Sequence, residues 1–320
     1  MWLGFIATIL DHCCEPCYVC VPIVFVCSCS CSRPYSCPCS CSLLPPLPHI
    51  LIEPIVRRAL EEDFGVSGDL SANLLVPEAA TGSLVMRARQ DGVIAGMQAA
   101  RLTYALVDQA VTFETVIDDG GAVEAGTIIA RVSGPSRSLL SAERVALNFL
   151  GRMSGVATLT SQYVTAVAGT GARIAATRKT TPGLRALEKQ AVLAGGGFTH
   201  RESLAAAIMI KDNHIALAGG VDKALTKVMA QRDHMTMVSV EVDTLAQLKR
   251  VLPYHPNVVL LDNMGPDQLR EAKQIIGDAR ITVEASGGVN LDTVRGIAET
   301  GVDVISVGAL THSAPNFDIG

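Results

Sequence analysis

The sequence predicts an α/β protein in which a small α+β unit precedes a barrel of alternating strands and helices. Short β-branched runs recur in the second half, and helical stretches fill the gaps between them. Each run carries a polar residue near its end, and Glu241, Asp262, Glu284 and Ser306 follow one another at intervals of 21, 22 and 22 residues. The first part instead shows strands broken by glycine turns. A closed (β/α) barrel fits the repeat best, and a doubly wound open sheet is the alternative.

Composition excludes several classes of protein. Of the 320 residues, 49% are hydrophobic, which excludes a mostly disordered chain. The 26 basic and 31 acidic residues leave a formal net charge of −5, so binding of nucleic acid through bulk positive charge is not expected. From residue 49 onward no uninterrupted apolar run is long enough to span a membrane. We therefore expect a globular protein with neither nucleic acid nor membrane as its partner.

The first 48 residues differ from the rest of the chain. All ten cysteines lie between Cys13 and Cys41. Residues 1–48 also contain seven of the chain's fifteen prolines. The Cys17-x-x-Cys20 spacing is compatible with a metal-binding tract, and the short apolar pieces with a targeting segment. We favour a third interpretation, a dispensable and disordered extension over 1–48. A cysteine-free body argues against a secreted disulfide protein and favours a cytoplasmic location.

Residues 49–155 are predicted to form the first domain. Apolar residues recur at helical spacing from Ile50 to Glu62 and again from Met97 to Asp108. The runs that read as strands, broken by glycine turns, are 84–86, 92–94 and 127–132. A long helical pattern from Leu139 to about Met153 joins this domain to the next.

Residues 156–309 are predicted to form the barrel. Its expected strands are Arg173–Ala176, Ala207–Ile210, Val238–Asp243, Val258–Asp262, Ile281–Ala285 and Val302–Val307. Its clearest expected helices are Leu245–Leu252, Asp267–Ile276 and Leu291–Glu299. In such barrels the working residues project from the carboxyl ends of the strands, so the polar residues at these ends are the candidate site.

Basic residues gather around two of these strand ends. Between Arg173 and Lys211 there are seven Lys or Arg residues and only two acids, which favours a small polyanionic ligand. Arg178, Lys179 and Lys211 border apolar runs at strand ends, so we assign them to ligand binding. Three of the other charged residues, Arg185, Glu188 and Lys189, are expected on a solvated helix face.

Two glycine loops and three acids complete the candidate site. The loops Ala285–Asn290 and Val307–Ser313 follow the last two strands, where barrels commonly bind phosphate through backbone N–H groups. Glu241 and Asp262 would repel an anion unless they meet hydroxyl groups or a cation, and a sugar phosphate with Mg²⁺ supplies both. For Glu284, capping a helix or pairing with Lys or Arg is nearly as good an explanation.

Several segments together resemble quinolinate phosphoribosyltransferase, the carboxylating nicotinate-nucleotide pyrophosphorylase. The two most specific are Thr177–Arg185, which reads TRKTTPGLR, and Ile210–Ile215, which reads IKDNHI. The others are Ser141–Leu150, Met153–Thr158, Gly195–Gly197, His200–Arg201, Val240–Asp243, Leu260–Met264, Glu284–Gly288 and Ser306–Ser313. They run in the family's order from His49 to the C-terminus, whereas residues 1–48 match nothing in the family.

The resemblance implies a fold and a reaction. The fold is an N-terminal α/β sandwich domain plus an incomplete (β/α) barrel of type II phosphoribosyltransferases, with residues 310–320 returning toward the first domain. The reaction converts quinolinate and phosphoribosyl pyrophosphate, with Mg²⁺, into nicotinate mononucleotide, CO₂ and pyrophosphate. The implied assembly is a homodimer with a shared active site, and a hexamer is left open. The alternatives are a same-fold paralogue linked to molybdate transport and a non-catalytic anion-binding barrel; His200, Arg201 and Lys211 favour the dicarboxylate substrate over the paralogue.

The resemblance also implies the role of each site residue. The residues expected to bind the quinolinate carboxylates are Arg178, His200, Arg201 and Lys211, with Arg144 reaching in from the partner subunit. Lys179 would hold phosphoribosyl pyrophosphate, and Glu241 and Asp262 would contact the ribose hydroxyls or the metal. The residues expected around the 5′-phosphate are Ser286, Gly287, Gly288 and Gly308. Those expected to be catalytic are Lys211, Arg178, Glu241 and Asp262.

Three positions depart from the family pattern. Ala176, Thr199 and Ala206 stand where family members carry Asp, Asn and Asp. These positions are expected to orient the residues that touch substrate, so the departures concern orientation and rate more than reaction type.

Overall fold

The computed structural model describes residues 45–320, and the predictions for the cysteine-rich segment lie outside the described residues. Within residues 45–320, no helix combines the length and the hydropathy that crossing a membrane requires.

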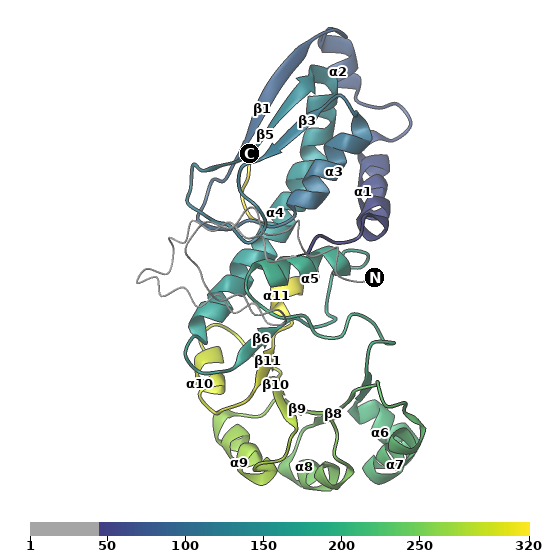
Figure 1. Cartoon of the computed structure of the whole chain (residues 1–320), viewed down its shortest axis with the longest axis vertical. Helices are drawn as coiled ribbons and strands as arrows, with labels where there is room; N and C mark the ends of the chain where they lie inside the picture. The colour runs from purple at the N-terminus through teal and green to yellow at the C-terminus, as the bar shows by residue number, and fades with distance from the viewer. Residues whose placement is uncertain (1–44) are drawn as a thin grey trace, which may run out of the picture. The chain divides into compact units, whose positions relative to one another are not determined.

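The first part of the described chain is an antiparallel sheet packed against helices (Figure 1). The sheet has the order β1-β5-β3, in which β1 is Thr81–Arg87, β3 is Thr112–Thr115 and β5 is Ile128–Pro135. The other elements here are α1 (His49–Phe64), α2 (Leu70–Leu75), α3 (Met97–Val107) and the short pair β2 (Gly92–Val93) and β4 (Ala122–Val123). The inner face of the sheet packs Met86, Ala130 and Val132 into an apolar core with α3 and the next helix. The predicted helices and strands of this part are confirmed to within a few residues.

The next helix, α4, runs as one element from Ser136 to Ala166, well past the predicted end near Met153. Its small residues interrupt the apolar pattern in the sequence, which is why the pattern ended too early. In the fold they serve close packing, because a Cβ on Gly155 would lie 2.0 Å from the carbonyl oxygen of Pro315. Ser154, fully buried, accepts a hydrogen bond of 3.0 Å from the backbone N–H of Ala95. The boundary predicted between residues 155 and 156 falls inside this helix, so the domain limits stay a prediction.

The second part is a six-stranded parallel sheet surrounded by helices, in the order β6-β11-β10-β9-β8-β7. The strands are β6 (Arg173–Ala175), β7 (Ile208–Ile210), β8 (Val238–Val242), β9 (Val258–Asp262), β10 (Thr282–Ser286) and β11 (Val304–Ser306). The helices are α5 (Arg185–Ala194), α6 (Asp212–Ala218), α7 (Val221–Gln231), α8 (Leu245–Val251), α9 (Pro266–Ile276), α10 (Val294–Ala298) and α11 (Ala309–His312), with a 3₁₀ turn at Leu252–Tyr254. Figure 1 shows α6 to α10 on the outside of the curved sheet.

The barrel is incomplete, because the sheet ends at β6 and β7. The closed barrel that the repeat alone favoured is therefore wrong, and the open form implied by the family resemblance is confirmed. The physical reason lies beside β6, where Phe198 occupies the free edge. Its N–H donates to the carbonyl of Ile174 and its carbonyl accepts from the N–H of Ala176, each at 2.8 Å. The chain then leaves this edge toward β7 without forming another strand.

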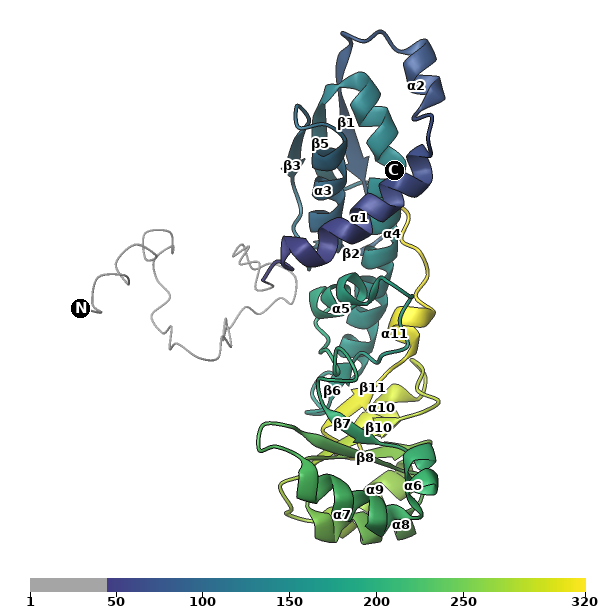
Figure 2. The ribbon, with the colours of Figure 1, turned by 90° about the vertical axis from the view of Figure 1, so that its right-hand side faces the viewer.

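The last residues run back from α11 along α4 to the first sheet (Figure 2). The N–H of Arg87 donates to the carbonyl of Gly320 at 2.7 Å, and the N–H of Arg89 to that of Asp318 at 3.0 Å. Phe317 is buried in the core of the first part. The tail thus ties the barrel to the sheet at the other end of α4.

Candidate functional site

A cavity of about 570 Å³ lies at the carboxyl ends of the barrel strands. Every site residue predicted from the sequence lines it except Arg144: Arg178, Lys179, His200, Arg201, Lys211, Glu241, Asp262, Ser286, Gly287, Gly288 and Gly308. The cavity wall also includes Thr177, Met209, Leu260, Glu284, Val289, Ser306, Ala309 and His312. Parallel strands bring their carboxyl ends to one edge, which is how residues more than a hundred positions apart meet here.

The five basic residues come from three separate segments. Arg178 and Lys179 follow β6, His200 and Arg201 follow the edge residue Phe198, and Lys211 follows β7 directly. Burial lowers the pKa of Arg201, and the neighbouring Arg178 guanidinium lowers it further. The Nε atom of Arg178 is buried and has no hydrogen-bond partner among the described residues. The cavity thus combines positive charge with an unused hydrogen-bond donor, which suits a small polyanion.

Lys211 and Glu241 form an ion pair within the wall of the cavity. The Lys211 ammonium donates to Oε2 of Glu241, whose side chain is only 12% exposed. The backbone N–H of Lys211 donates to Nδ1 of His214 at 3.0 Å, which fixes the start of α6. The pair places one cation and one anion where β7 and β8 end side by side.

Glu284 lies inside the barrel and faces a histidine, so neither the helix cap nor the pairing with Lys or Arg is found. Its Oε1 is 3.4 Å from Nε2 of His200, and its side chain is 5% exposed. The geometry is too poor for a hydrogen bond, so this oxygen has no hydrogen-bond partner within residues 45–320. Glu284 thus gives His200 an anionic neighbour on the floor of the cavity.

Asn263, which the sequence analysis missed, organises the acidic side of the cavity. Its side-chain N–H donates to Oδ2 of Asp262 at 2.9 Å, and its backbone N–H donates to the carbonyl of Ser286 at 2.9 Å. It adopts a left-handed backbone with φ of 54°, unusual for a residue with a side chain. A Cβ on Gly287 would lie 2.1 Å from Oδ1 of Asn263, so only glycine fits there. The position of Asn263 directly after the strand-end acid was the available signal.

The loop after β11 approaches Lys179 closely. A Cβ on Gly308 would lie 3.1 Å from both Cδ of Lys179 and Nε2 of His312. The hydroxyl of Thr311 donates to the carbonyl of Lys179 at 2.7 Å. His312 therefore joins the wall of the cavity through tertiary packing, and its place in the last glycine loop was the only hint in the sequence.

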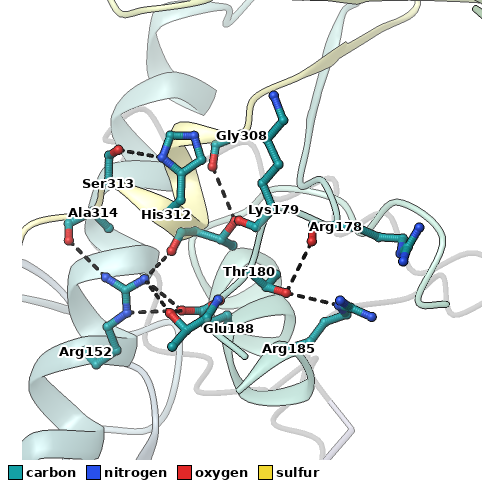
Figure 3. A network of polar contacts seen from close by, with 12 residues as sticks. Arg152, Arg178, Lys179, Thr180, Arg185, Glu188, Gly308, His312, Ser313 and Ala314 are labelled. Carbon is teal, nitrogen blue, oxygen red and sulfur yellow. Dashed lines mark hydrogen bonds and ion pairs between the residues drawn. The ribbon is translucent and has the colours of Figure 1, made fainter. Parts of the chain in front are cut away.

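Two buried charged residues of α5 contact the segments that form the cavity wall. The interpretation of Glu188 and Lys189 as a solvated helix face is wrong, since their side chains are 0% and 2% exposed. Glu188 accepts hydrogen bonds from Nη2 of Arg152 at 2.7 Å and from the hydroxyl of Thr181 at 2.7 Å. Figure 3 shows Arg152 between this carboxylate and the carbonyl of Ala314. The sequence could not show this burial, because Glu188 pairs with Arg152 on α4 and Lys189 binds the backbone of His200 and Arg201.

Arg144 lies elsewhere. It is exposed on α4 and does not line the cavity. Of the three positions that depart from the family pattern, Ala176 is buried after β6, while Thr199 and Ala206 line a second cavity of about 440 Å³ that also borders His200 and Arg201.

Comparison with known proteins gives a consistent result. Residues 69–154 match the family described as quinolinate phosphoribosyl transferase, N-terminal domain, and residues 156–320 match its C-terminal domain. The chain is 38% identical over 271 residues to a probable nicotinate-nucleotide pyrophosphorylase (carboxylating) of Bacillus subtilis, covering 85% of this chain and 93% of that protein. It is 41% identical over 293 residues to quinolinate phosphoribosyltransferase (decarboxylating) 1 of Nicotiana glauca, covering 86% and 83%.

Solved structures agree with these sequence matches. The crystal structure of NadC from Streptococcus pyogenes has a TM-score of 0.83 at 37% identity, covering 86% of this chain and 97% of that one. The nicotinate-nucleotide pyrophosphorylase from Francisella tularensis has a TM-score of 0.82 at 34% identity, covering 86% and 96%.

Proposed function

The chain belongs to the quinolinate phosphoribosyltransferase family, and on this premise we propose that its barrel cavity carries out the family's reaction. The enzyme transfers the phosphoribosyl group of phosphoribosyl pyrophosphate to quinolinate, giving nicotinate mononucleotide, CO₂ and pyrophosphate for NAD biosynthesis. The observation that carries the proposal is the convergence of five basic residues and two strand-end acids on one cavity.

The cationic wall suits quinolinate, which carries two carboxylates on adjacent ring carbons. We assign their binding to Arg178, His200, Arg201 and Lys211. A guanidinium can grip a carboxylate with two parallel hydrogen bonds, so two arginines hold a planar dianion in one orientation. Lys211 can exchange its contact with Glu241 for a substrate carboxylate, which frees Glu241 to face the sugar.

The other residues of the cavity suit phosphoribosyl pyrophosphate. Lys179 is assigned to its phosphates, Glu241 and Asp262 to its ribose hydroxyls, and the loop Ser286–Gly288 with Gly308 to its 5′-phosphate. Gly287 and Gly288 both have positive φ, with values of 88° and 62°, so the chain can turn sharply and expose its backbone to an anion.

Magnesium is proposed as the required ion. The described residues contain no cluster of three or more His, Cys, Asp or Glu that could hold a metal by themselves. Mg²⁺ is commonly held by one or two carboxylates together with substrate phosphates and water, so Glu241 and Asp262 fit an ion that enters with phosphoribosyl pyrophosphate. When bound, the ion offsets the negative charge of the departing pyrophosphate.

The residues of the cavity support a reaction that needs little proton transfer. As pyrophosphate leaves, positive charge develops on the ribose carbon, and the carboxylates of Glu241 and Asp262 stabilise it. The pyridine nitrogen of quinolinate then forms the new bond to that carbon. The quaternised ring stabilises the electron pair that stays behind when the carboxylate next to the nitrogen departs as CO₂, and that ring carbon then takes up one proton from water. Because no strong base is required, the main contribution of Arg178, Arg201 and Lys211 is to hold quinolinate in line with the sugar.

We propose a homodimer in which Arg144 of each subunit completes the partner's cavity, with a hexamer of such dimers left open. The exposed position of Arg144, away from the cavity of its own chain, supports this assignment. A cytoplasmic location is proposed as well, although plant relatives include proteins named as mitochondrial or chloroplastic.

Mixing inactive Arg144→Ala and Lys211→Ala proteins is expected to restore activity through hybrid dimers. In a twofold-symmetric dimer, one of the two sites of each hybrid has neither substitution, so the mixture should recover about a quarter of wild-type turnover. The control mixes Lys211→Ala with Glu241→Ala, whose residues lie in the same cavity, and should recover nothing. Absence of recovery in the first mixture, with subunit exchange demonstrated by differently tagged chains, would exclude the shared site.

One assay tests the proposed function directly. Purified protein supplied with quinolinate, phosphoribosyl pyrophosphate and Mg²⁺ is expected to form nicotinate mononucleotide, followed by chromatography, and to stop when the ion is chelated. The same assay on a chain lacking residues 1–48 separates this function from a metal-binding role of the cysteine tract. Turnover by the shortened chain would show that the cysteine tract is not required for the activity. Absence of turnover by the full chain would contradict the proposal.

A further inference from the structure

Two consecutive charged residues of α5, Glu188 and Lys189, are buried, although neither lines the cavity. Consecutive residues of an α-helix point about 100° apart, so the two side chains reach different neighbours. Glu188 reaches the loop that carries Arg178 and Lys179 through Thr181. Lys189 reaches the separate segment that carries His200 and Arg201.

The ammonium of Lys189 binds the backbone of both residues in that segment. It donates to the carbonyl oxygen of His200 and, at 2.7 Å, to that of Arg201. Its third neighbour is the carboxylate of Glu202, 3.4 Å away and itself 57% exposed. The side chains of His200 and Arg201 line the cavity on the other side of this backbone.

The segment needs such an anchor because it lacks regular structure. Between the bridge at Phe198 and the start of β7 at Ile208, residues 199–207 contain no helix or strand. Within it, Arg201 donates from Nη1 to the carbonyl of Ala207 at 3.2 Å, and Arg185 donates to the carbonyl of Glu202 at 3.1 Å. Lys189 is the buried residue that holds the backbone of His200 and Arg201, the two residues of this segment that line the cavity.

Burial of an ammonium is unfavourable unless its donors are used, and apolar side chains of similar length would fill the same space. Burial indeed lowers the pKa of Lys189, an effect to which Arg185 and Arg178 add and which Glu202 opposes. Packing alone therefore does not explain a lysine at this position, whereas the two carbonyl contacts do.

We propose that Lys189 is a positioning residue for the dicarboxylate half of the site. By fixing the carbonyls of His200 and Arg201, it holds their side chains at the separation that the two carboxylates of quinolinate require. This inference rests on the proposed function. Glu188 supplies a matched control, because it is equally buried on the same helix turn but supports the loop of Arg178 and Lys179, of which one is assigned to each substrate.

The test compares Lys189→Met with Glu188→Gln in the full chain. Lys189→Met should raise the Michaelis constant for quinolinate about tenfold or more, and that for phosphoribosyl pyrophosphate less than about threefold. Glu188→Gln should not raise the quinolinate constant preferentially. Lys189→Arg, which keeps the charge and several donors, should return the quinolinate constant to within about threefold of wild type.

Hydrogen exchange followed by mass spectrometry supplies a readout that does not depend on turnover. Uptake in residues 198–207 of the protein without substrates should rise in Lys189→Met and stay unchanged in Glu188→Gln. Equal increases in both Michaelis constants, or unchanged uptake in 198–207, would overturn the inference. If the methionine variant does not fold, Lys189→Gln, which keeps one donor group, is judged by the same two criteria. A wild-type chain without turnover would refute the proposed function, whereas the exchange measurement would still decide the role of Lys189.

Discussion

Lys211→Ala is expected to lower kcat/KM by about a thousandfold, the largest effect of any single side chain in the cavity. The substitution leaves one quinolinate carboxylate without its cation and leaves the 12%-exposed Glu241 carboxylate without its partner. An unpaired anion on the ribose side of the cavity also repels both substrates. Steady-state kinetics with quinolinate as the varied substrate measures the loss.

The matched control for this experiment is Lys227→Ala. Lys227 lies exposed on α7 and does not line the cavity, so its removal should change kcat/KM less than about twofold. If Lys211→Ala kept near wild-type kinetics, the assignment of Lys211 to the substrate carboxylate would be wrong.

Gly155→Ala is expected to give the largest loss of stability for the smallest added group. The new Cβ would lie 2.0 Å from the carbonyl oxygen of Pro315 and 3.4 Å from the backbone nitrogen of Phe317. Neither atom belongs to a flexible side chain, so the tail would have to move away from α4. Overpacking of this kind costs about 1–3 kcal/mol, and more where backbone must shift. Thermal unfolding should show a fall in Tm of about 3–10 °C.

Gly296→Ala supplies the control for that measurement. Gly296 lies in α10, its added Cβ would meet no atom within 4 Å, and its φ is not positive. Alanine at this position should leave Tm unchanged or raise it slightly, because alanine favours the helix. A fall in Tm of the same size in both variants would show that close packing of the tail on α4 is not the cause.

Much of the site could be predicted because working residues lie at the carboxyl ends of parallel strands. Glu241, Asp262 and Lys211 were placed correctly in the cavity because each follows a β-branched run, and parallel strands bring their carboxyl ends together. This reasoning uses only local pattern and chain order. It holds wherever the backbone, not a distant partner, decides the position of the side chain.

The residues that were missed or misjudged depend on distant partners. Glu188 and Lys189 have the spacing of a solvated helix face, yet both are buried because Arg152 and the carbonyls of His200 and Arg201 satisfy their charges. Asn263 contributes through a contact with Gly287, which arrives on the next strand. No local pattern contains these pairings.

The sequence by itself determined the six barrel strands and three of the helices between them, the family, and the side chains that gather at the barrel mouth, because periodicity and chain order are local properties. Only the tertiary structure decided that the barrel stays open beside Phe198, that α4 continues to Ala166, and that charged residues of α5 are buried behind the site. The physical reason is common to all three. Whether a strand edge is paired, where a helix ends and whether a charge can be buried all depend on the groups available to form the contacts. Here those groups come from other parts of the chain.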